Sequence, residues 1–489
     1  MSIKEELVNV LGEKNIIDDS KELVNYGGGR NFDLHIDPCF IAKPKDAGQV
    51  KKIIELANKT KTPIVPVSSG WPHVKGGSAP NIPEAIMVDL SEMKNIININ
   101  RQQRMVVVEP GVTYGQLDKA LAKEGLELPF PLKPRASKSV VASVLETEPR
   151  MNPMNQWSYV DPLRCVEVIW GDGNHMFTGE AAGGPMDLEK QWQSEKWQVN
   201  GYGPWMLDFY RVLTGAQGCM GVVTWTALKC QVRKQIHEMY FVKDDSLQEI
   251  TAFVYKAIRL RFPDELFILN NMQLACILGK NKVEIDFWKG ILPKWIALVG
   301  VAGRELLPEK RVEVRSKDLA DIAQSCGLEL LPSLPKLNGK TVIKEIETPS
   351  EDYWKDIFKG ASQDIFFLTT LDRVDDFICK MYEVANEFGY PANDIGIYIQ
   401  PQHMGSSYHC EFTLPYDPSS SKERELVKKV YTKASVEMSK LDAYYSRPYE
   451  MWAGLQLNKD AQSYSVLKKM KQIFDPNGIM NPGKISLQI

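Results

Sequence analysis

Hydrophobic positions in the first 180 residues follow helical spacing in some segments and strand spacing in others. Residues 49–59 (QVKKIIELANK) repeat apolar side chains at helical spacing, which predicts a helix. The β-branched run 62–67 (TPIVPV) predicts a strand directly after it. Further strands are predicted at 86–90 and 105–111, a helix at 116–125, and two strands joined by a Gly-Asp-Gly turn at 165–179. Short strands and short loops in this order predict an α+β fold rather than regular βαβ alternation.

A second α+β pattern occupies residues 232–442. Helices are predicted at 246–259, 373–389 and 422–438, and strands at 364–371, 395–402 and 408–416. The longest apolar run, Trp295 to Ala302, is too short to span a bilayer and predicts a buried strand or short helix. Residues 178–204, rich in Gly, Glu, Gln and Trp, predict a long surface loop. The tail 465–485 predicts a helix closed by a Pro- and Gly-rich turn.

Length and charge narrow the classes of protein that fit this pattern. A chain of 489 residues is too long for one hydrophobic core, so two or three domains are expected. Lys and Arg total 59 against 62 for Asp and Glu, a formal net charge of -3. Such a balance gives no general electrostatic reason to bind nucleic acid or an anionic membrane surface. We therefore expect no nucleic-acid partner and no membrane span.

Cysteine and histidine spacing argues against a metal site. The eight cysteines are dispersed without a C-x-x-C pair, and the six histidines show no H-E-x-x-H or H-x-H pattern. No zinc ribbon, iron–sulfur cluster or other metal is therefore predicted. The first 15 residues lack the apolar core of a secretory signal, so reduced thiols and a cytoplasmic location are expected.

A glycine-rich loop follows the strand predicted at 62–67. Between Pro66 and Gly77 it carries two serines and the glycines Gly70, Gly76 and Gly77. Such a loop can direct several backbone N–H groups to one point, as pyrophosphate binding requires. It is neither a Walker loop nor G-x-G-x-x-G, and by itself a structural turn fits equally well.

Three further blocks follow this loop along the chain: VVVEPGVT at 106–113, GAQGCMGVVT at 215–224 and FDPNGIMNPGK at 474–484. In this order the four blocks resemble the vanillyl-alcohol oxidase and 4-cresol dehydrogenase family of FAD enzymes. The resemblance runs along nearly the whole chain and is nearest to the 4-alkylphenol-oxidising branch. The segments YGPWMLDFY (202–210) and AYYSRP (443–448) support it.

The resemblance implies a PCMH-type FAD-binding domain built from both chain ends, residues 1–230 and 443–489, with an α+β cap domain at 231–442 inserted between them. FAD is the implied cofactor, with its pyrophosphate on the loop 68–77, where glycine permits close approach of the backbone. Its adenosine would lie near 221–223, and its flavin near the C-terminal turn. The implied FAD-binding residues are Pro66, Val67, Ser68, Ser69, Gly70, Trp71, Gly76, Gly77, Pro110, Gly111, Ser139, Ala142, Ser143, Gly218, Gly221, Val222, Val223, Tyr408, Asn481 and Lys484.

The resemblance also implies a way of holding the substrate. In phenol-oxidising relatives, tyrosines and an arginine hold the substrate as a phenolate, and hydride passes from the para-alkyl carbon to the flavin. Tyr445 and Arg447 fall near the positions of that pair. A packed core aromatic for Tyr445, and a surface ion pair for Arg447, are the alternatives.

Several positions depart from the branch. Lys75 replaces a second phenolate tyrosine, Ser158 replaces a catalytic aspartate, and Ala142-Ser143 replaces a glycine–asparagine step. These changes indicate a substrate other than a simple 4-alkylphenol, such as an anion met by Lys75, His73 and Arg447. His73 could act as a base because its unperturbed pKa lies near neutrality. Alternatively, Lys75 is a solvated loop residue and His73 caps a turn.

The position of a covalent flavin link is also open. Tyr408 or His409 would be the linker, and non-covalent FAD is expected. The function expected is hydride transfer from a small aromatic substrate, a 4-alkylphenol or benzylic alcohol, to FAD. A 2-hydroxy-acid dehydrogenase of the same fold, or an FAD-holding subunit of a larger redox complex, are the alternatives. The electron acceptor stays open between oxygen, a cytochrome and another carrier. A partner protein and an assembly of like or unlike subunits are therefore expected.

Overall fold

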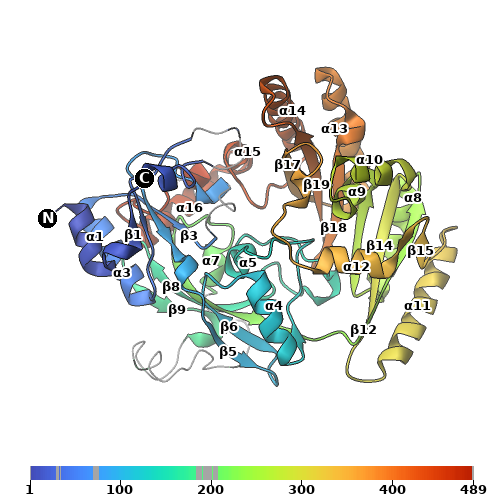
Figure 1. Ribbon diagram of the computed structural model, residues 1–489, viewed down its shortest axis with the longest axis horizontal. Coiled ribbons are helices and arrows are strands. Elements are labelled where there is room, and N and C mark those ends of the chain that lie inside the picture. The colour runs from blue at the N-terminus through green and yellow to red at the C-terminus, as the bar shows by residue number, and fades with distance from the viewer. Residues whose placement is uncertain are drawn as a thin grey trace.

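The computed structural model describes residues 2–28, 32, 35–69, 76–182, 190, 201 and 208–486. Most of the segment 178–204, predicted as a surface loop, lies outside these residues. Figure 1 shows the chain folded into two α+β halves, the N-terminal half in blue and cyan and the middle of the chain in green to orange. None of the described helices is both long and apolar enough to cross a bilayer.

The N-terminal half contains two sheets. The first has the order β1 (Ile16–Ile17), β2 (Phe40–Ala42), β4 (Ile86–Asp89), β3 (Ile64–Val67). The second has the order β5 (Ile96–Asn100), β6 (Met105–Val108), β10 (Gly221–Lys229), β8 (Leu163–Trp170), β9 (His175–Phe177). The helices of this half include α1 (Ile3–Leu11), α3 (Ala47–Thr60), α4 (Tyr114–Lys123) and α5 (Val140–Leu145). The elements predicted from the pattern at 49–67, 86–90, 105–125 and 165–179 are confirmed.

The middle of the chain, which we call the cap half, is built on one six-stranded sheet. Its order is β12 (Ile236–Asp244), β14 (Trp295–Gly303), β13 (Glu265–Asn270), β18 (Gly396–Gln402), β19 (Ser407–Tyr416), β17 (Ala361–Thr369). The hydrophobic core on one face includes α8 (Leu247–Leu260), α11 (Pro308–Gln324), α13 (Val374–Phe388) and α14 (Ser421–Lys440). The core on the other includes α9 (Asn271–Leu278), α10 (Lys282–Ile291) and α12 (Gly339–Glu347). The apolar run at 295–302 is therefore a strand, β14.

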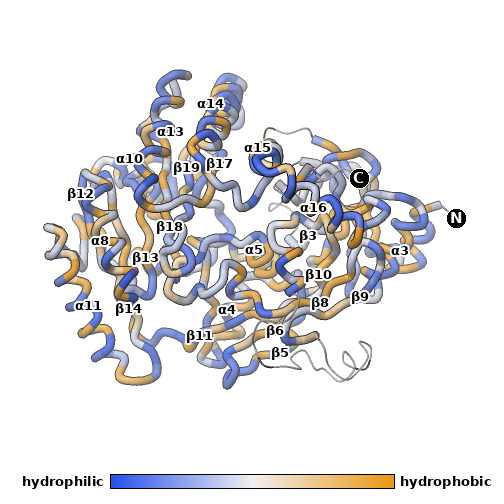
Figure 2. Tube along the Cα trace, turned by 180° about the vertical axis from the view of Figure 1, so that it is seen from behind, coloured by the Kyte–Doolittle hydropathy of each residue, from blue (hydrophilic) through white to orange (hydrophobic). Residues whose placement is uncertain are grey.

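Strand alternation decides which side chains of this sheet meet the helices. On β19, Tyr408, Cys410 and Phe412 pack into the core beside α13 and α14. Because successive side chains of a strand point to opposite faces, His409 and Glu411 face the other side. Figure 2 shows the matching pattern on the outer helices, where hydrophilic and hydrophobic colours alternate along α13 and α14.

The C-terminal segment returns to the N-terminal half. Helices α15 (Met451–Leu457) and α16 (Ala461–Phe474) lead to a turn in which Met480 forms a parallel bridge with Ile64 of β3. In Figure 1 the two chain ends lie on the same side of the molecule. The start of this segment also contacts the cap half, because Tyr445 and Trp452 belong to its core. The division of the chain into three parts, with boundaries at residues 230 and 442, stays a prediction.

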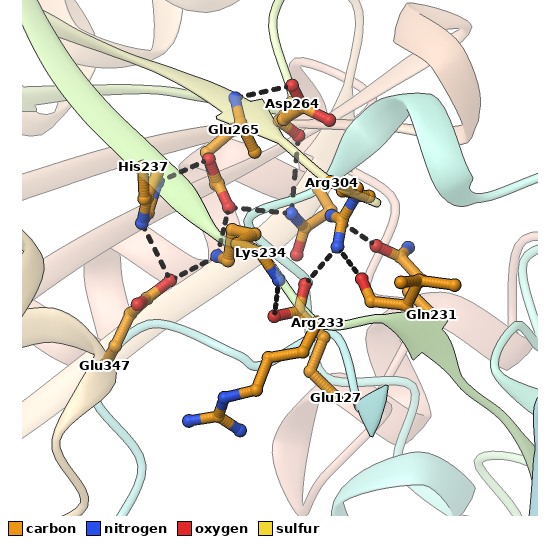
Figure 3. A network of polar contacts seen from close by, with 12 residues as sticks. Glu127, Gln231, Arg233, Lys234, His237, Asp264, Glu265, Arg304 and Glu347 are labelled. Carbon is orange, nitrogen blue, oxygen red and sulfur yellow. Dashed lines mark hydrogen bonds and ion pairs between the residues drawn. The ribbon is translucent and has the colours of Figure 1, made fainter. Parts of the chain in front are cut away.

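A set of buried and half-buried polar residues, all but one of them ionisable, lies where the chain passes from the first half into the cap, and we call it the junction network. It comprises Glu127 (β7, Leu126–Glu127), Gln231 (β11, Gln231–Val232), Lys234, His237, Asp264, Glu265, Arg304 and Glu347 (Figure 3). Lys234 Nζ lies 2.7 Å from Glu265 Oε1 and also contacts Glu347, while Arg304 Nη1 lies 2.8 Å from Glu127 Oε1. The network therefore joins strands of the first half to the sheet and α12 of the cap half.

Candidate functional site

A cavity of about 310 Å³ lies between the two halves, and we call it the main cavity. One wall comes from the first half: β3 and the serines after it, residues 141–149, and residues 215–223 at the start of β10. The facing wall comes from the cap half: residues 353–355 and side chains of β17, β18 and β19. Arg447 and Tyr449, which follow α14, complete it.

Eleven of the residues that the resemblance implied for FAD line this cavity. They are Pro66, Val67, Ser68, Ser69, Gly77, Pro110, Ala142, Gly218, Gly221, Val222 and Val223. They come from four separate stretches of the chain that the structure brings to one wall. This gathering is consistent with one cofactor lying along the wall.

Close packing explains two of the glycines. Gly218 has φ +72°, and a Cβ there would lie 2.5 Å from Pro66 Cγ. A Cβ at Gly221 would lie 2.7 Å from the carbonyl oxygen of Ile169 on the neighbouring strand β8. Both positions therefore accept only glycine without a backbone shift. They hold the residue 217–221 turn against β3 and β8.

Other implied residues support the wall from behind. Ser139 caps α5: its backbone N–H donates to Ser69 Oγ at 2.7 Å, and its Oγ donates to the Pro110 carbonyl at 2.6 Å. A Cβ at Gly111 would lie 2.5 Å from the Ser91 carbonyl, so this glycine serves packing. Gly76 begins the short helix η2 (Gly76–Ser78).

The C-terminal turn reaches the same wall, although its residues are not lining ones. Asn481 Nδ2 donates to the carbonyls of Gly77 at 2.7 Å and Gln217 at 2.6 Å. Lys484 Nζ donates to Asn81 Oδ1 at 2.6 Å. Asn481 therefore ties the glycine-rich loop to the 215–224 block.

Two buried acceptors beside the cavity fit a ligand that carries N–H donors. Gln217 Oε1 and Asn481 Oδ1 are buried, and neither accepts a hydrogen bond within the part of the chain that the structure describes. Buried acceptors without a donor are costly, which makes them typical of positions that a ligand satisfies. FAD supplies such donors, so the residues present fit this cofactor.

Arg447 brings to the main cavity a cation that forms no ion pair among the described residues. It is buried, and its Cζ lies 3.8 Å from the centre of the Phe366 ring. Lys133, Lys138 and Lys355 also line the cavity, but each has a carboxylate partner at the distance of an ion pair. Arg447 has no ion pair or side-chain hydrogen bond among the residues described. The alternative for Arg447, a surface ion pair, is therefore not seen among the described residues.

The charges around Arg447 are fixed by neighbouring pairs. Lys355 Nζ lies 2.8 Å from Asp364 Oδ2 and 2.6 Å from Glu411 Oε1. Burial alone would lower the pKa of Lys355, but the two carboxylates outweigh it and raise that pKa well above its usual value. Burial of Glu148 likewise opposes its ionisation, but Lys138 and Arg447 lower its pKa to about 2. These groups stay charged at neutral pH.

Two phenols line the cavity near Arg447. Burial raises the pKa of Tyr449 well above its usual value, and the neighbouring Glu146 carboxylate adds to this rise. Burial also raises the pKa of Tyr398, whose hydroxyl donates to Gln400 Oε1 at 2.9 Å. The hydroxyl of Tyr449 therefore stays protonated, with its hydrogen bond directed to the Glu146 carboxylate.

The structure does not bring every predicted residue to the cavity. Tyr445 is 1 % exposed, donates to the Ser435 carbonyl at 2.7 Å and stacks on Trp452, so it is a packed core aromatic. Ser143 is a buried residue of α5 and donates to Glu148 Oε2 at 2.6 Å. Tyr408 faces the helices of the cap half. Gly70, Trp71, His73 and Lys75 lie outside the described residues.

Several residues of the site were not found from the sequence. Tyr398, Phe366, Lys355, Asp364, Glu411 and Tyr449 line the cavity. Two of them could have been found from the sequence, because a charged residue within an otherwise apolar strand requires a partner. These are Glu411 in 408–416 and Asp364 in 361–369. The position of Tyr449, two residues beyond Arg447, had no such signal.

Two protein families match parts of this chain. Residues 38–175 match the FAD binding domain family, and residues 368–485 match the C-terminal domain of FAD linked oxidases. The second match includes β18 and β19 of the cap wall together with the C-terminal segment.

Curated relatives are similar along the chain at low identity. The glycolate oxidase subunit GlcD of Bacillus subtilis is 21% identical over 99% of this chain and 96% of its own length. The D-2-hydroxyglutarate dehydrogenase of Stutzerimonas stutzeri is 23% identical over 98% of both chains. The 4-cresol dehydrogenase flavoprotein subunit of Pseudomonas putida is 27% identical over 54% of this chain and 49% of its own.

Solved structures establish the fold. A p-cresol methylhydroxylase with bound substrate matches with a TM-score of 0.84 and 17% identity, covering 99% of this chain and 96% of its own. The 4-ethylphenol oxidase of Gulosibacter chungangensis matches with a TM-score of 0.82 and 15% identity at the same coverage. The fold is thus that of p-cresol methylhydroxylase (PCMH), as expected from the four sequence blocks. With these matches, the chain belongs to the FAD-linked oxidoreductases of PCMH-type fold, and FAD is its cofactor.

Proposed function

We propose that the protein oxidises a small aromatic substrate, a 4-alkylphenol or benzylic alcohol, that is held as an anion by Arg447. The observation that carries this proposal is the buried guanidinium of Arg447 in the main cavity, without a carboxylate partner among the described residues. A buried cation without a counter-charge is costly, so an anionic substrate would be bound there. Phe366, Tyr398 and Tyr449 around it offer aromatic surfaces for a ring.

Each part of the cavity has a role in this proposal. Bound FAD supplies the acceptor for the hydride of the substrate's benzylic carbon. Arg447 holds the oxyanion, because a fixed positive group favours the anionic form from which hydride leaves more readily. Tyr449, whose hydroxyl is hydrogen-bonded to Glu146, offers its ring to the substrate on the same wall of the cavity. Lys75 and His73, outside the described residues, remain proposed as a second cation and a base.

Cofactor binding is proposed for the lining residues of the first half, together with Asn481 and Lys484. The loop 68–77 would hold the pyrophosphate, and 221–223 the adenosine. Non-covalent FAD is proposed, because Tyr408 points into the helix layer. His409 is buried on the cavity side of β19 and remains the second position for a link.

A 2-hydroxy acid is the second candidate substrate. Full-length similarity to proteins named as a glycolate oxidase subunit and a D-2-hydroxyglutarate dehydrogenase favours it. A carboxylate would bind to Arg447 in the same way as a phenolate, since both are oxyanions that accept hydrogen bonds from a guanidinium. A subunit that holds FAD within a redox complex is the third reading, and two relatives are named as subunits. An electron-acceptor protein is therefore proposed as a partner.

A cytoplasmic location is proposed as well. All eight cysteines are free, and five of them are buried. This is the pattern of a reducing compartment.

Anaerobic reduction of the bound flavin tests these candidates. Wild-type protein is mixed with 4-ethylphenol, 4-hydroxybenzyl alcohol, glycolate and D-2-hydroxyglutarate, and bleaching of the flavin absorbance is followed. We expect a phenol to reduce it fastest. Arg447→Met should slow this step at least about tenfold, about 1.4 kcal/mol of transition-state stabilisation, with FAD content unchanged.

Arg259→Met, an exposed arginine on α8, is the matched control and should behave as wild type. Faster reduction by a hydroxy acid would replace the aromatic proposal with the second candidate. No reduction by any of the four would favour the redox-subunit reading. A wild-type rate in Arg447→Met would contradict the role of the guanidinium.

A further inference from the structure

A second cavity, of about 240 Å³, lies between residues 150–162 and residues 229–231 at the end of β10. It shares no lining residue with the main cavity. Three cationic residues line it, Arg104, Arg150 and Lys229, against one carboxylate, Asp161. We call it the second cavity.

Arg150 is the central feature of this cavity. The residue is only 1 % exposed, yet no carboxylate lies within ion-pair distance of it in the described part of the chain. Its Nη1 donates to the Tyr114 hydroxyl at 2.7 Å and to the Pro129 carbonyl at 3.2 Å. The structure records no acceptor for Nε or Nη2 among the described residues. Burying a guanidinium without a counter-charge is costly unless an anion or water compensates for it.

The guanidinium is held rigidly by a chain of hydrogen bonds. The Tyr114 hydroxyl, which accepts from Arg150, donates to Ser143 Oγ at 2.7 Å. Ser143 in turn donates to Glu148 Oε2 at 2.6 Å. All the links are buried or partly buried, so the arginine is fixed before any ligand arrives. Preorganised donors of this kind raise affinity because little side-chain entropy is lost on binding.

The single carboxylate of the cavity is engaged elsewhere. Asp161 Oδ2 accepts from the backbone N–H groups of Trp157 at 2.7 Å and Ser158 at 2.9 Å. Asp161 is therefore stabilised by the backbone and forms no ion pair with Arg150. The charge of the cavity stays positive.

A neutral donor and an opening complete the site. Gln156 is 4 % exposed, and its Oε1 accepts from the His403 N–H at 3.2 Å, which leaves its amide NH₂ as a donor. Trp157 and Arg104 line the cavity and are exposed, so the cavity is reachable from solvent.

We propose that the second cavity binds a small oxyanion, the phosphate or carboxylate group of a free metabolite, through Arg150 and Lys229. The guanidinium offers the planar pair of donors that matches such a group. This site is distinct from the substrate position at Arg447 and does not depend on the proposed reaction.

Binding to the FAD-loaded protein tests the proposal. Calorimetric titration with inorganic phosphate, sulfate and acetate, at constant ionic strength with chloride, separates a phosphate-type from a carboxylate-type ligand. All titrations use protein carrying Arg447→Met, so that the main cavity does not contribute. We expect saturable binding of at least one of the three anions and a matching rise in Tm.

Two variants locate the site. Arg150→Met should abolish the binding. Lys229→Glu, at the half-buried end of β10, should weaken it at least tenfold without disturbing the buried arginine. Lys428→Glu, an exposed lysine on α14 with the same change of charge, should bind as the parent does. Should Arg150→Met not fold, Lys229→Glu against Lys428→Glu decides the question.

Two outcomes would overturn the proposal. One is the absence of saturable binding by any of the three anions. The other is equal affinity in the Lys229→Glu and Lys428→Glu proteins. In the first case the arginine is compensated by water alone.

Discussion

At the residue scale, Tyr445 and Arg447 lie two residues apart but point into different parts of the molecule. Tyr445 turns into the core of the cap half and gives its hydroxyl to the Ser435 carbonyl, whereas Arg447 enters the main cavity. The phenol beside Arg447 comes instead from Tyr449. The resemblance implied that Tyr445 and Arg447 act as a pair. Arg447 does line the cavity, but Tyr445 lies in the core, and the tyrosine that lines the cavity beside Arg447 is Tyr449.

Substitution of the two tyrosines separates their roles. Tyr445→Phe should leave flavin reduction unchanged and lower stability by about 1–3 kcal/mol, because the Ser435 carbonyl loses its buried donor. Tyr449→Phe should slow reduction by a confirmed substrate several-fold, since the cavity-lining Glu146 loses its donor and its negative charge then opposes the bound anion, with little change in stability. Urea unfolding and anaerobic stopped-flow measure the two effects. The reverse pattern would show that Tyr445, and not Tyr449, serves the substrate.

At the element scale, the alternation of β17, β18 and β19 builds the cap wall of the main cavity. One face of these strands carries Ile365, Ile397 and Phe412 into the helix-covered core. The other carries Asp364, Tyr398 and Glu411 to the cavity. The same alternation separates Tyr408 from His409, so a shift of one residue decides which of them faces the cofactor side.

Tyr408→Phe tests this register. The Tyr408 hydroxyl is buried without a hydrogen-bond partner among the described residues, so its removal should leave stability unchanged or slightly higher. Flavin should remain in the supernatant after acid precipitation in both proteins, as non-covalent binding requires. A yellow pellet from wild type that turns colourless in the variant would instead identify Tyr408 as a covalent link.

At the scale of the whole molecule, the junction network couples the two halves that enclose the main cavity. His237 Nε2 lies 3.0 Å from Glu265 Oε2, and its Nδ1 lies 3.5 Å from Glu347 Oε1. These three side chains are close enough to surround a cation, and Lys234 occupies that place (Figure 3). The ammonium group of Lys234 therefore balances the negative charge of Glu265 and Glu347, as a bound cation would.

The network predicts a dependence of stability on pH. Burial alone would lower the pKa of His237, but Glu265 and Glu347 outweigh burial and the repulsion of Lys234, and raise the pKa to about 9. A folded-state pKa above the unfolded value of about 6.5 means that the contribution is complete below pH ~6.5 and disappears as the pH rises through ~9. Its size is on the order of 3 kcal/mol.

Urea unfolding of wild type and His237→Gln between pH 6 and 10 measures this contribution. The difference in free energy of unfolding should be largest near pH 6 and shrink toward pH 10. A difference that stays constant across this range would show that the imidazole is not protonated in the folded protein.

The sequence by itself determined the elements and the cofactor class. Apolar periodicity placed several helices and strands of both halves, including the strands of the cap wall, and predicted a buried strand or short helix at β14, because burial of one face enforces a fixed spacing. The order of the four glycine-containing blocks indicated an FAD protein of PCMH type. The glycines at 218 and 221 are visible in the sequence. The structure shows why they are glycines, since no other residue fits against Pro66 and Ile169.

Only the tertiary structure decided which side chains share the main cavity. Arg447, Phe366 and Tyr398 come from separate elements, and their meeting depends on how the cap sheet lies against residues 141–149 of the first half. The same holds for Arg150, whose lack of a carboxylate partner is a property of its surroundings rather than of its neighbours in sequence. Spacing along a chain fixes the face of an element, but contacts between distant elements depend on packing, which no local pattern records.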